Sequence, residues 1–177
     1  MLSGPFPNVI RCPLLIGEEV ESRTKTMWPE LLSAVIKDMT DFGHKPQLPC
    51  PDSEIAELRR RARTDLGNEL PPEYLALLTR VNGLNWNGLF IYASRPSRME
   101  GRPDLTISGV VEINQAYRRA VCMDDYLVLA DWDTDIYAHH IPTNTFLVTS
   151  KPSLVVLETY ADCGSLLAFA LRTALGE

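Results

Sequence analysis

The clearest hydrophobic pattern in the chain lies just before its midpoint. Apolar residues recur there at helical spacing, which predicts a short helix with one buried face; they are Tyr74, Leu77, Leu78 and Val81. Pro71 and Pro72 precede them and favour a helix start, because proline has a helical φ and lacks only an N–H that a first turn does not use. Asn82 and Gly83 follow and favour the left-handed conformation that ends a helix.

Three further segments carry helical patterns. One begins at residues 51–53, which offer an N-cap, and ends at Gly67. Its apolar face consists of Ile55, Leu58, Ala62 and Leu66. A second begins at Trp28 and ends at residues 42–43, with Leu32, Val35, Ile36 and Met39 on one face. The last follows Asp162 or Ser165 as its cap and turns Leu166, Leu167, Phe169, Ala170 and Leu171 inward.

After Gly83 the hydrophobic period becomes that of strands. Strands are predicted at residues 89–92, 126–130, 136–141, 146–149 and 153–157. The run at 126–130 is unbroken and apolar, which is typical of a strand buried on both faces. Residues 142–144 form a turn that brings the next strand back antiparallel. Residues 94–104 are polar and predict an exposed loop, and 105–113 predict a strand, or a strand that runs into a helix capped by Asn114 and continuing to Ala120.

This order of elements predicts an α+β fold, with N-terminal helices and a C-terminal helix packed on a mainly antiparallel sheet. A chain of 177 residues is long enough for one well-cored domain and short for two. Residues 51–177 form the predicted domain. Residues 1–50 are interpreted as an arm and a helix of the same fold, and the arm includes a short strand at residues 12–16.

Composition favours a globular protein in the cytoplasm. The chain is 45% hydrophobic and 23% charged, which is near the average for globular domains. It contains no apolar run of membrane-spanning length, and its first residues do not resemble a secretory signal. The four cysteines are far apart and form no C-x-x-C pair, so we expect reduced, structural thiols.

Negative charge is concentrated in the last third of the chain. The net charge is −6, yet residues 1–123 contain 15 basic and 15 acidic residues, whereas residues 124–177 contain 8 acidic and 2 basic ones. This distribution argues against nucleic-acid binding, which requires Lys and Arg to displace counterions from phosphate. It favours a basic partner, or it serves solubility alone.

The most conspicuous polar cluster is Asp131-Trp132-Asp133-Thr134-Asp135. A calcium loop is excluded, because the glycine and glutamate positions of such a loop fall on Ile136 and Pro142. Three interpretations stay open. The cluster is a solvated turn between strands, a partner-facing acidic patch, or a carboxylate site for magnesium, since alternate residues of an extended segment point the same way.

Residues 85–88 supply a second candidate contact. Asn85 and Trp86 are expected in a loop, and Trp132 is expected in the acidic turn. Tryptophan is a frequent interface anchor, so two such residues beside polar neighbours favour a binding surface, although core packing explains either of them alone.

Other candidates favour structural roles. His139 and His140 are adjacent on a predicted strand, so they point to opposite faces and do not easily share a metal ion. The basic run at residues 59–63 is interpreted as the solvated face of a helix. No phosphate-binding loop, dinucleotide fingerprint or nucleophile elbow is present, and no catalytic residue, metal site or cofactor is predicted.

The two central helices together resemble the opening motif of the SUKH superfamily of Smi/Knr-type proteins. The resemblance rests on Glu54-Ile55, Leu66-Gly67, Leu70-Pro71-Pro72-Glu73-Tyr74 and Asn82-Gly83. It implies an α+β domain without catalytic residues, covering roughly residues 52–175. Most members of the superfamily are bacterial immunity proteins that neutralise a cognate toxin, often a nuclease, and a minority are interaction modules in eukaryotic regulatory proteins.

These observations predict an immunity protein that binds a basic toxin through direct contact, with no enzymatic activity of its own. The candidate contact residues are Asp131, Trp132, Asp133, Asp135, Trp86 and Asn85. Nucleic acid and membrane are not expected as partners. Two alternatives remain: a regulatory module that binds a host protein, and a metal-assisted hydrolase that uses the aspartates with a histidine.

Overall fold

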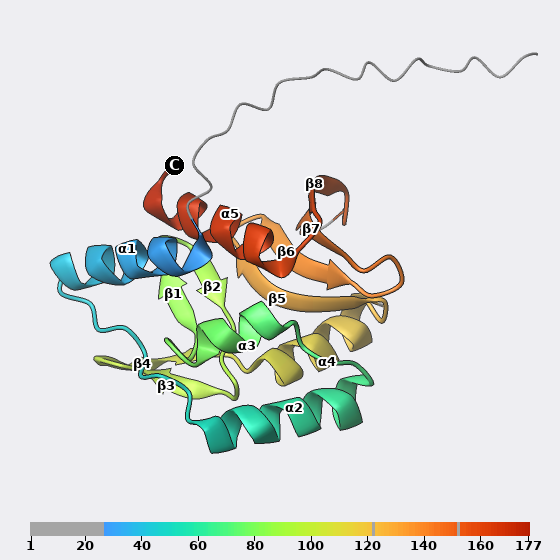
Figure 1. Ribbon diagram of the computed structural model, residues 1–177, viewed down its shortest axis with the longest axis horizontal. Helices are drawn as coiled ribbons and strands as arrows, with labels where there is room; N and C mark the ends of the chain where they lie inside the picture. The colour runs from blue at the N-terminus through green and yellow to red at the C-terminus, as the bar shows by residue number, and fades with distance from the viewer. Residues whose placement is uncertain (1–26, 122, 152) are drawn as a thin grey trace, which may run out of the picture.

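The computed structural model describes residues 27–121, 123–151 and 153–177. Within these residues the chain forms five helices and eight strands (Figure 1). The helices are α1 (Trp28–Asp41), α2 (Asp52–Leu66), α3 (Pro72–Leu78), α4 (Val110–Val121) and α5 (Cys163–Leu175). The strands are β1 (Leu84–Trp86), β2 (Leu89–Ile91), β3 (Ser97–Met99), β4 (Arg102–Ile107), β5 (Tyr126–Trp132), β6 (Asp135–His140), β7 (Thr145–Ser150) and β8 (Val156–Tyr160).

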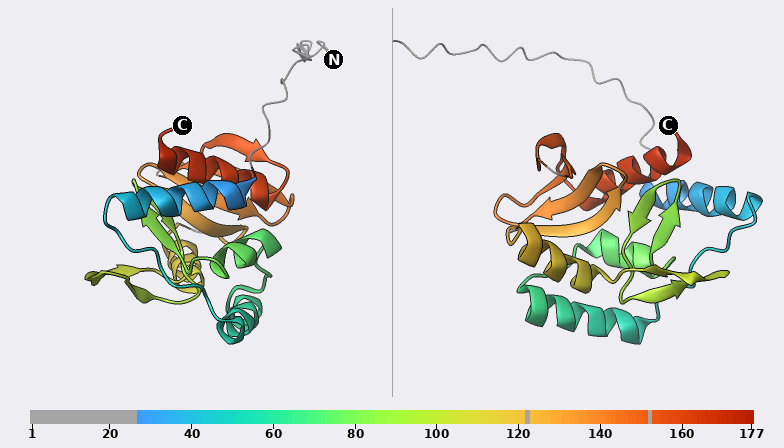
Figure 2. Two further views of the ribbon diagram at one scale, coloured as in Figure 1. Left: turned by 60° about the vertical axis from the view of Figure 1, so that its left-hand side comes forward. Right: turned by 180° about the vertical axis from the view of Figure 1, so that it is seen from behind.

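Six of the described strands form one antiparallel sheet in the order β1-β2-β5-β6-β7-β8, and β3 pairs with β4 in a separate ribbon. Helix α5 lies across the sheet and contacts β2, β6, β7 and β8, while α1 packs on α5. Helix α4 contacts β5 and is covered in turn by α2, as the rotated views in Figure 2 show. The predicted α+β fold, with helices packed on a mainly antiparallel sheet, is confirmed.

The two-helix motif forms as the sequence predicts, except that α3 is shorter. Helix α2 has the predicted bounds and ends at Gly67, whose φ is 69°. Helix α3 ends at Leu78, because the connector before α2 provides other partners for the next backbone groups. The Cys50 N–H donates to the Leu78 carbonyl, and the Asn82 N–H donates to the Leu48 carbonyl.

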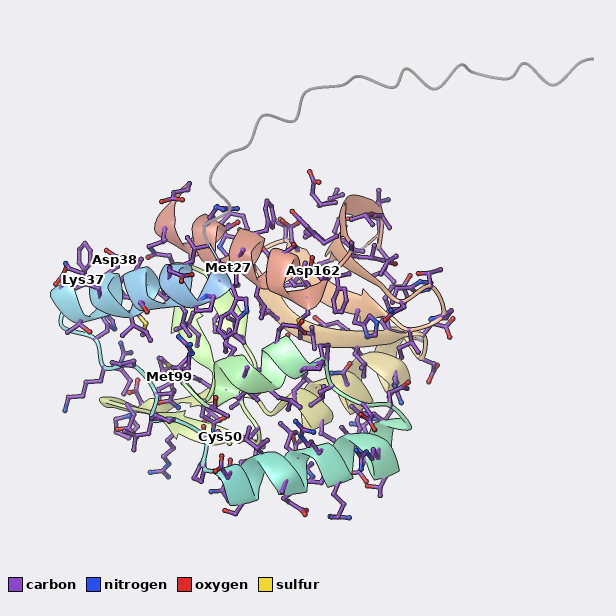
Figure 3. All side chains as sticks on the ribbon, viewed as in Figure 1. Met27, Lys37, Asp38, Cys50, Met99 and Asp162 are labelled. Carbon is purple, nitrogen blue, oxygen red and sulfur yellow. The ribbon has the colours of Figure 1, made fainter. Side chains whose placement is uncertain are left out.

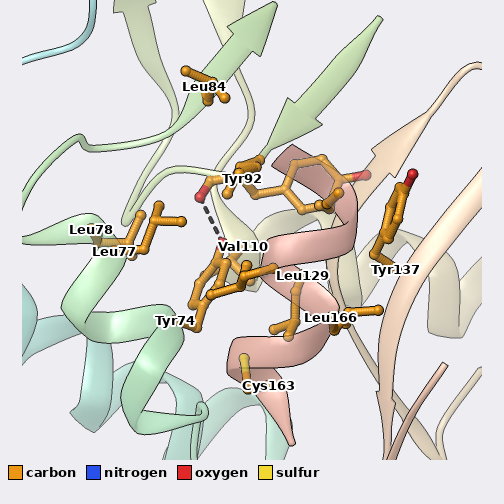
Figure 4. Close-up of a cluster of buried hydrophobic side chains, with 14 of the residues drawn as sticks. Tyr74, Leu77, Leu78, Leu84, Tyr92, Val110, Leu129, Tyr137, Cys163 and Leu166 are labelled. Carbon is orange, nitrogen blue, oxygen red and sulfur yellow. Dashed lines mark hydrogen bonds between the residues drawn. The ribbon is translucent and has the colours of Figure 1, made fainter. Parts of the chain in front are cut away.

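The core joins the motif to the sheet and to α5. Tyr74 is fully buried, and its hydroxyl donates a 2.6 Å hydrogen bond to the Tyr92 carbonyl (Figure 4). Burial raises the pKa of Tyr74 well above its ordinary value, so this hydroxyl stays protonated. Cys163 and Leu166 of α5 pack into the same cluster.

Residues 94–104 were expected to be a loop, and this prediction is wrong. They contain β3 and the first part of β4. Both strands of this ribbon are largely exposed, so their sequences carry little of the apolar alternation from which a strand is predicted. Gln47 fixes the ribbon to the connector before α2. Its amide donates to the Arg98 carbonyl at 3.1 Å and accepts from the Glu100 N–H at 2.6 Å.

Asn114 is not a helix cap as predicted, but a buried residue inside α4. Its Nδ2 donates to the Val110 and Val128 carbonyls, both at 2.8 Å, and its Oδ1 accepts from the Val128 N–H at 2.7 Å. Asn114 therefore satisfies both backbone groups of one residue of β5. The β5–β6 register shifts just after this residue, between Val128 and Ala130.

This register shift decides which side chains β5 presents at its end. An uninterrupted ladder from Val128 and Ala138 would place Asp131 opposite Asp135, and like charges in that position are destabilising. The bulge instead pairs Asp131 with Ile136 and Trp132 with Asp135. Side chains alternate along a strand. The one-residue shift therefore also places the Asp131 side chain, and likewise that of Trp132, on the face of the sheet opposite to the one it would occupy in an uninterrupted ladder.

The remaining elements follow the predicted order with small shifts. The strands predicted at 136–141 and 146–149 form as β6 and β7 and pair antiparallel, and the last strand lies a few residues later than predicted. Asp162 caps α5 by accepting from the Ser165 N–H at 2.7 Å, as expected. The strand predicted at 12–16 lies outside the described residues. No helix among the described residues is long and apolar enough to cross a membrane.

The Asn114 contact gives a stability prediction. Asn114→Ala leaves the N–H and C=O of Val128 buried without partners, so we expect the free energy of unfolding in urea to fall by about 3 kcal/mol. Gln115→Ala, on the next residue of α4, is the matched control and should cost less than about 1 kcal/mol. Equal losses of unfolding free energy for the two variants would contradict a stabilising role of the Asn114 hydrogen bonds.

Candidate functional site

Three chain turns meet at one end of the sheet: the β1–β2 turn, the β5–β6 turn and the residues after β7. Their side chains line a shallow pocket of about 400 Å³. We call this region the hairpin-end surface, defined by its lining residues Asn87, Gly88, Phe90, Asp131, Trp132, Asp133 and Lys151.

The β1–β2 turn positions the Trp132 indole. Asn87 and Gly88 have φ values of 46° and 84°, the left-handed pair that a two-residue hairpin favours. Trp132 lies against this turn and donates from Nε1 to the Asn87 carbonyl at 2.9 Å. A Cβ atom on Gly88 would come within 2.7 Å of that Nε1, so only glycine fits beneath the ring. The Asn87 side chain in turn donates to the Ala174 carbonyl of α5 at 2.8 Å.

Asp131 is held by interactions within the protein. Its carboxylate pairs with Lys151 at 3.0 Å, and the two side chains are only 18% and 32% exposed. Burial, and then the charge of Asp131, raise the pKa of both Tyr92 and Tyr117. Asp131 is therefore held by its ion pair with Lys151, and it is less free to bind a partner than the sequence suggested.

Asp133 is the exposed carboxylate of the predicted cluster. Asp135 is half-buried and accepts from the Thr134 hydroxyl at 3.2 Å, while the Thr134 carbonyl accepts from the Lys151 N–H at 2.6 Å. Within the hairpin-end surface, Asp131, Asp133 and Lys151 leave a net charge of −1, and Asp135 lies outside its lining. Phe90, which is 39% exposed and is paired with Asp131, supplies the apolar part.

Trp86 and Asn85 lie in strand β1, not in a loop, and Trp86 is not on the surface. It is 8% exposed, and its Nε1 donates to Asp38 of α1 at 2.8 Å. Phe42 and His44 pack around its ring. Figure 3 labels Asp38 on the helix that covers this part of β1. Asn85 is half-buried and donates to the Met99 sulfur at 3.7 Å, so neither residue joins the hairpin-end surface.

Two residues of the surface were missed by the sequence analysis. Phe90 was assigned to a strand but not to a face, and Lys151 was counted only as a charge. Both lie beside Asp131: Phe90 is its direct cross-strand partner, and Lys151 forms an ion pair with it. The sequence gives no separate signal for either contact, because each depends on strand register.

The two adjacent histidines, which were considered as possible metal ligands, make structural contacts. His139 stacks on Phe146 with ring centroids 4.5 Å apart, and His140 contacts Tyr126 with ring centroids 4.8 Å apart. Both histidines are half-buried. Among the described residues, no group of three His, Cys, Asp or Glu side chains could hold a metal ion.

The basic run of α2 is largely neutralised by neighbouring acids. Arg60 pairs with Glu57 at 2.6 Å, Arg61 with Glu112 at 2.6 Å, and Arg63 with Glu69 at 2.9 Å. The run therefore presents less positive charge than its sequence suggests, as expected for a solvated helix face.

Residues of the SUKH-like motif join α2, α3 and the sheet. Glu54 accepts from the Ser94 hydroxyl and from Asn82 Nδ2, and it forms an ion pair with Arg95 at 3.1 Å. Asn82 Oδ1 accepts from the Ser94 N–H at 2.8 Å. This network explains Glu54 and Asn82 as structural residues, with Ser94 only 2% exposed between them.

Comparisons with known proteins do not add a family assignment. No protein-family model matches the chain, and no curated protein matches it. The SUKH resemblance therefore rests on the motif residues themselves.

The Trp132 contact with the β1–β2 turn gives a second prediction. Gly88→Ala adds a left-handed strain and a Cβ against the indole, so we expect a loss of roughly 2 kcal/mol or more in unfolding free energy and a shift in tryptophan fluorescence. Gly67→Ala is the matched control, because Gly67 has a φ of 69° and no atom within 4 Å of its added Cβ. It should cost about 1 kcal/mol from strain alone and leave the fluorescence unchanged. Indistinguishable spectra for the two variants would contradict the contact.

The described cysteines give a third prediction. Cys50 and Cys163 are free and buried, and burial raises the pKa of both thiols. Because thiolate is the reactive form, we expect iodoacetamide at about pH 8 to modify them roughly a hundredfold more slowly in the folded protein than in urea. Mass spectrometry of the two peptides measures this difference, and rapid labelling of either residue in the folded protein would contradict it.

Proposed function

We propose that the chain is an immunity protein that acts in the cytoplasm and neutralises a cognate toxin, with a basic surface, by direct contact at the hairpin-end surface. The observation that carries the proposal is the composition of this surface. A half-buried Trp132 and an exposed Phe90 lie in one shallow pocket beside exposed Asp133. Aromatic anchors with a charged rim are typical of protein-binding sites.

Electrostatics support a basic partner. The charged residues of the hairpin-end surface come from the acidic last third of the chain, and Asp133 is not paired with any described cation. Opposite charge accelerates encounter over a Debye length of about 8 Å at physiological salt. A nuclease-type toxin presents the basic cleft that such a surface would attract.

The SUKH-like motif supports the same proposal from another part of the chain. Glu54, Tyr74 and Asn82 hold the helices to the sheet, so the motif is compatible with a scaffold whose partner specificity lies in other residues. The contact set proposed here keeps Asp131, Trp132, Asp133 and Asp135, adds Phe90, and leaves out Trp86 and Asn85.

The first test is capture of the partner by the tagged full chain, followed by affinity measurements at low and high salt. Asp133→Lys should weaken binding about tenfold or more and reduce its salt dependence. Asp124→Lys is the matched control, because it makes the same change of charge at an exposed site at the other end of β5, about 20 Å away. It should leave both quantities nearly unchanged.

A growth assay separates a toxin from an ordinary partner. The captured polypeptide should arrest growth when expressed alone, and the wild-type chain should restore growth better than Asp133→Lys does. A captured protein without toxicity would favour the regulatory interaction module instead. Equal effects of the Asp133 and Asp124 variants would contradict the hairpin-end surface as the binding site.

A further inference from the structure

Strand β8 forms one edge of the six-stranded sheet. It pairs with β7 and with no other described strand, so the backbone groups on its outer side lack a sheet partner within the described chain. Val155, Val156 and Leu157, before and at its start, are 56%, 49% and 50% exposed. Proteins usually protect such an edge with lysine, proline or a covering segment. Strand β8 itself contains neither lysine nor proline.

A groove leads from this edge to the point where the described chain begins. It has a volume of about 420 Å³ and runs between the start of α1, helix α5 and the end of β8. Met27 and Trp28 line one side, and Tyr160 and Phe169 line the other. Met27 is 60% exposed, and Figure 3 shows it beside α5.

The chain outside the described region contains a segment of matching chemistry. Residues 12–16 read Cys-Pro-Leu-Leu-Ile, the strand predicted from the sequence, and residues 17–26 connect them to Met27. This connector spans at most about 33 Å when extended. Strand β8 is about 17 Å long. Because Met27 and Tyr160 line the same groove, the connector is long enough to bring residues 12–16 to either end of β8.

We propose that residues 12–16 bind in cis along the outer edge of β8 as an added strand, with the connector lying in the groove. Leu14 and Ile16 would then cover the exposed apolar side chains of the edge, and the backbone of β8 would gain partners. Proline is tolerated at the edge of a sheet, so Pro13 is compatible with this position.

Charge is consistent with the same path. The groove contains the carboxylates of Glu73 and Asp162 together with Arg172. The last residues before Met27 include Arg23 and Lys25, which would pass these carboxylates, whereas the more distant part of the connector is acidic. The proposal is independent of the immunity function, because it concerns a different edge of the sheet.

Hydrogen exchange of the full chain tests the proposal. In the wild type, we expect slow exchange at the β8 amides that point away from β7 and at the amides of residues 14–16. The double variant Leu14→Asp/Ile16→Asp should accelerate both sets by more than about tenfold, while β6 stays protected. Val20→Asp, which places the same charge in the connector, is the matched control and should change neither set.

A reciprocal variant keeps the test decisive. Leu157→Lys alters only an exposed side chain of β8, and it should release the amides of residues 14–16. Fast exchange at both sets in the wild type would overturn the proposal, as would β8 protection that survives Leu14→Asp/Ile16→Asp. Protection that grows with protein concentration, together with a dimer in sedimentation, would assign the edge to a second copy of the chain instead.

Discussion

The bulge of β5 determines how the end of the sheet is built. A bulge leaves backbone groups outside the regular ladder, and in a buried strand such groups cost free energy unless they find partners. Next to the bulge, Asn114 of the neighbouring helix α4 binds both backbone groups of Val128. The displaced register then puts Trp132 against the β1–β2 turn and turns Asp131 toward Lys151. The composition of the hairpin-end surface thus depends on this register shift.

The SUKH-like motif and the candidate surface have separate physical roles. Tyr74, Glu54 and Asn82 use their polar groups on buried or half-buried partners within the fold. Asp133 and Phe90, by contrast, are exposed. In a family whose members bind different partners, a shared motif of this kind would identify the scaffold, and the partner would be selected by loop and strand-end residues that the motif does not include.

Local patterns predict most of the helices and the buried strands β2, β5, β6 and β7, because each carries its own hydrophobic period: α2 begins and ends where its N-terminal residues and Gly67 indicate. Features that depend on distant partners are not predictable in this way. The β3–β4 ribbon is exposed and lacks alternation, and Trp86 is covered by α1, whose Asp38 lies 48 positions earlier in the chain. The acidic cluster was found from the sequence, but the pairing of Asp131 with Lys151 requires the register of three strands.

The most direct test of the account is lysine footprinting of the chain bound to its captured partner. Lys151 is the described lysine of the hairpin-end surface, whereas Lys37 lies on α1 and Lys45 lies beside the turn of the β3–β4 ribbon. The account predicts that the partner slows acetylation of Lys151 and leaves Lys37 and Lys45 unchanged. Protection of Lys37 or Lys45 with Lys151 still reactive would place the partner on another face and contradict the proposed binding site.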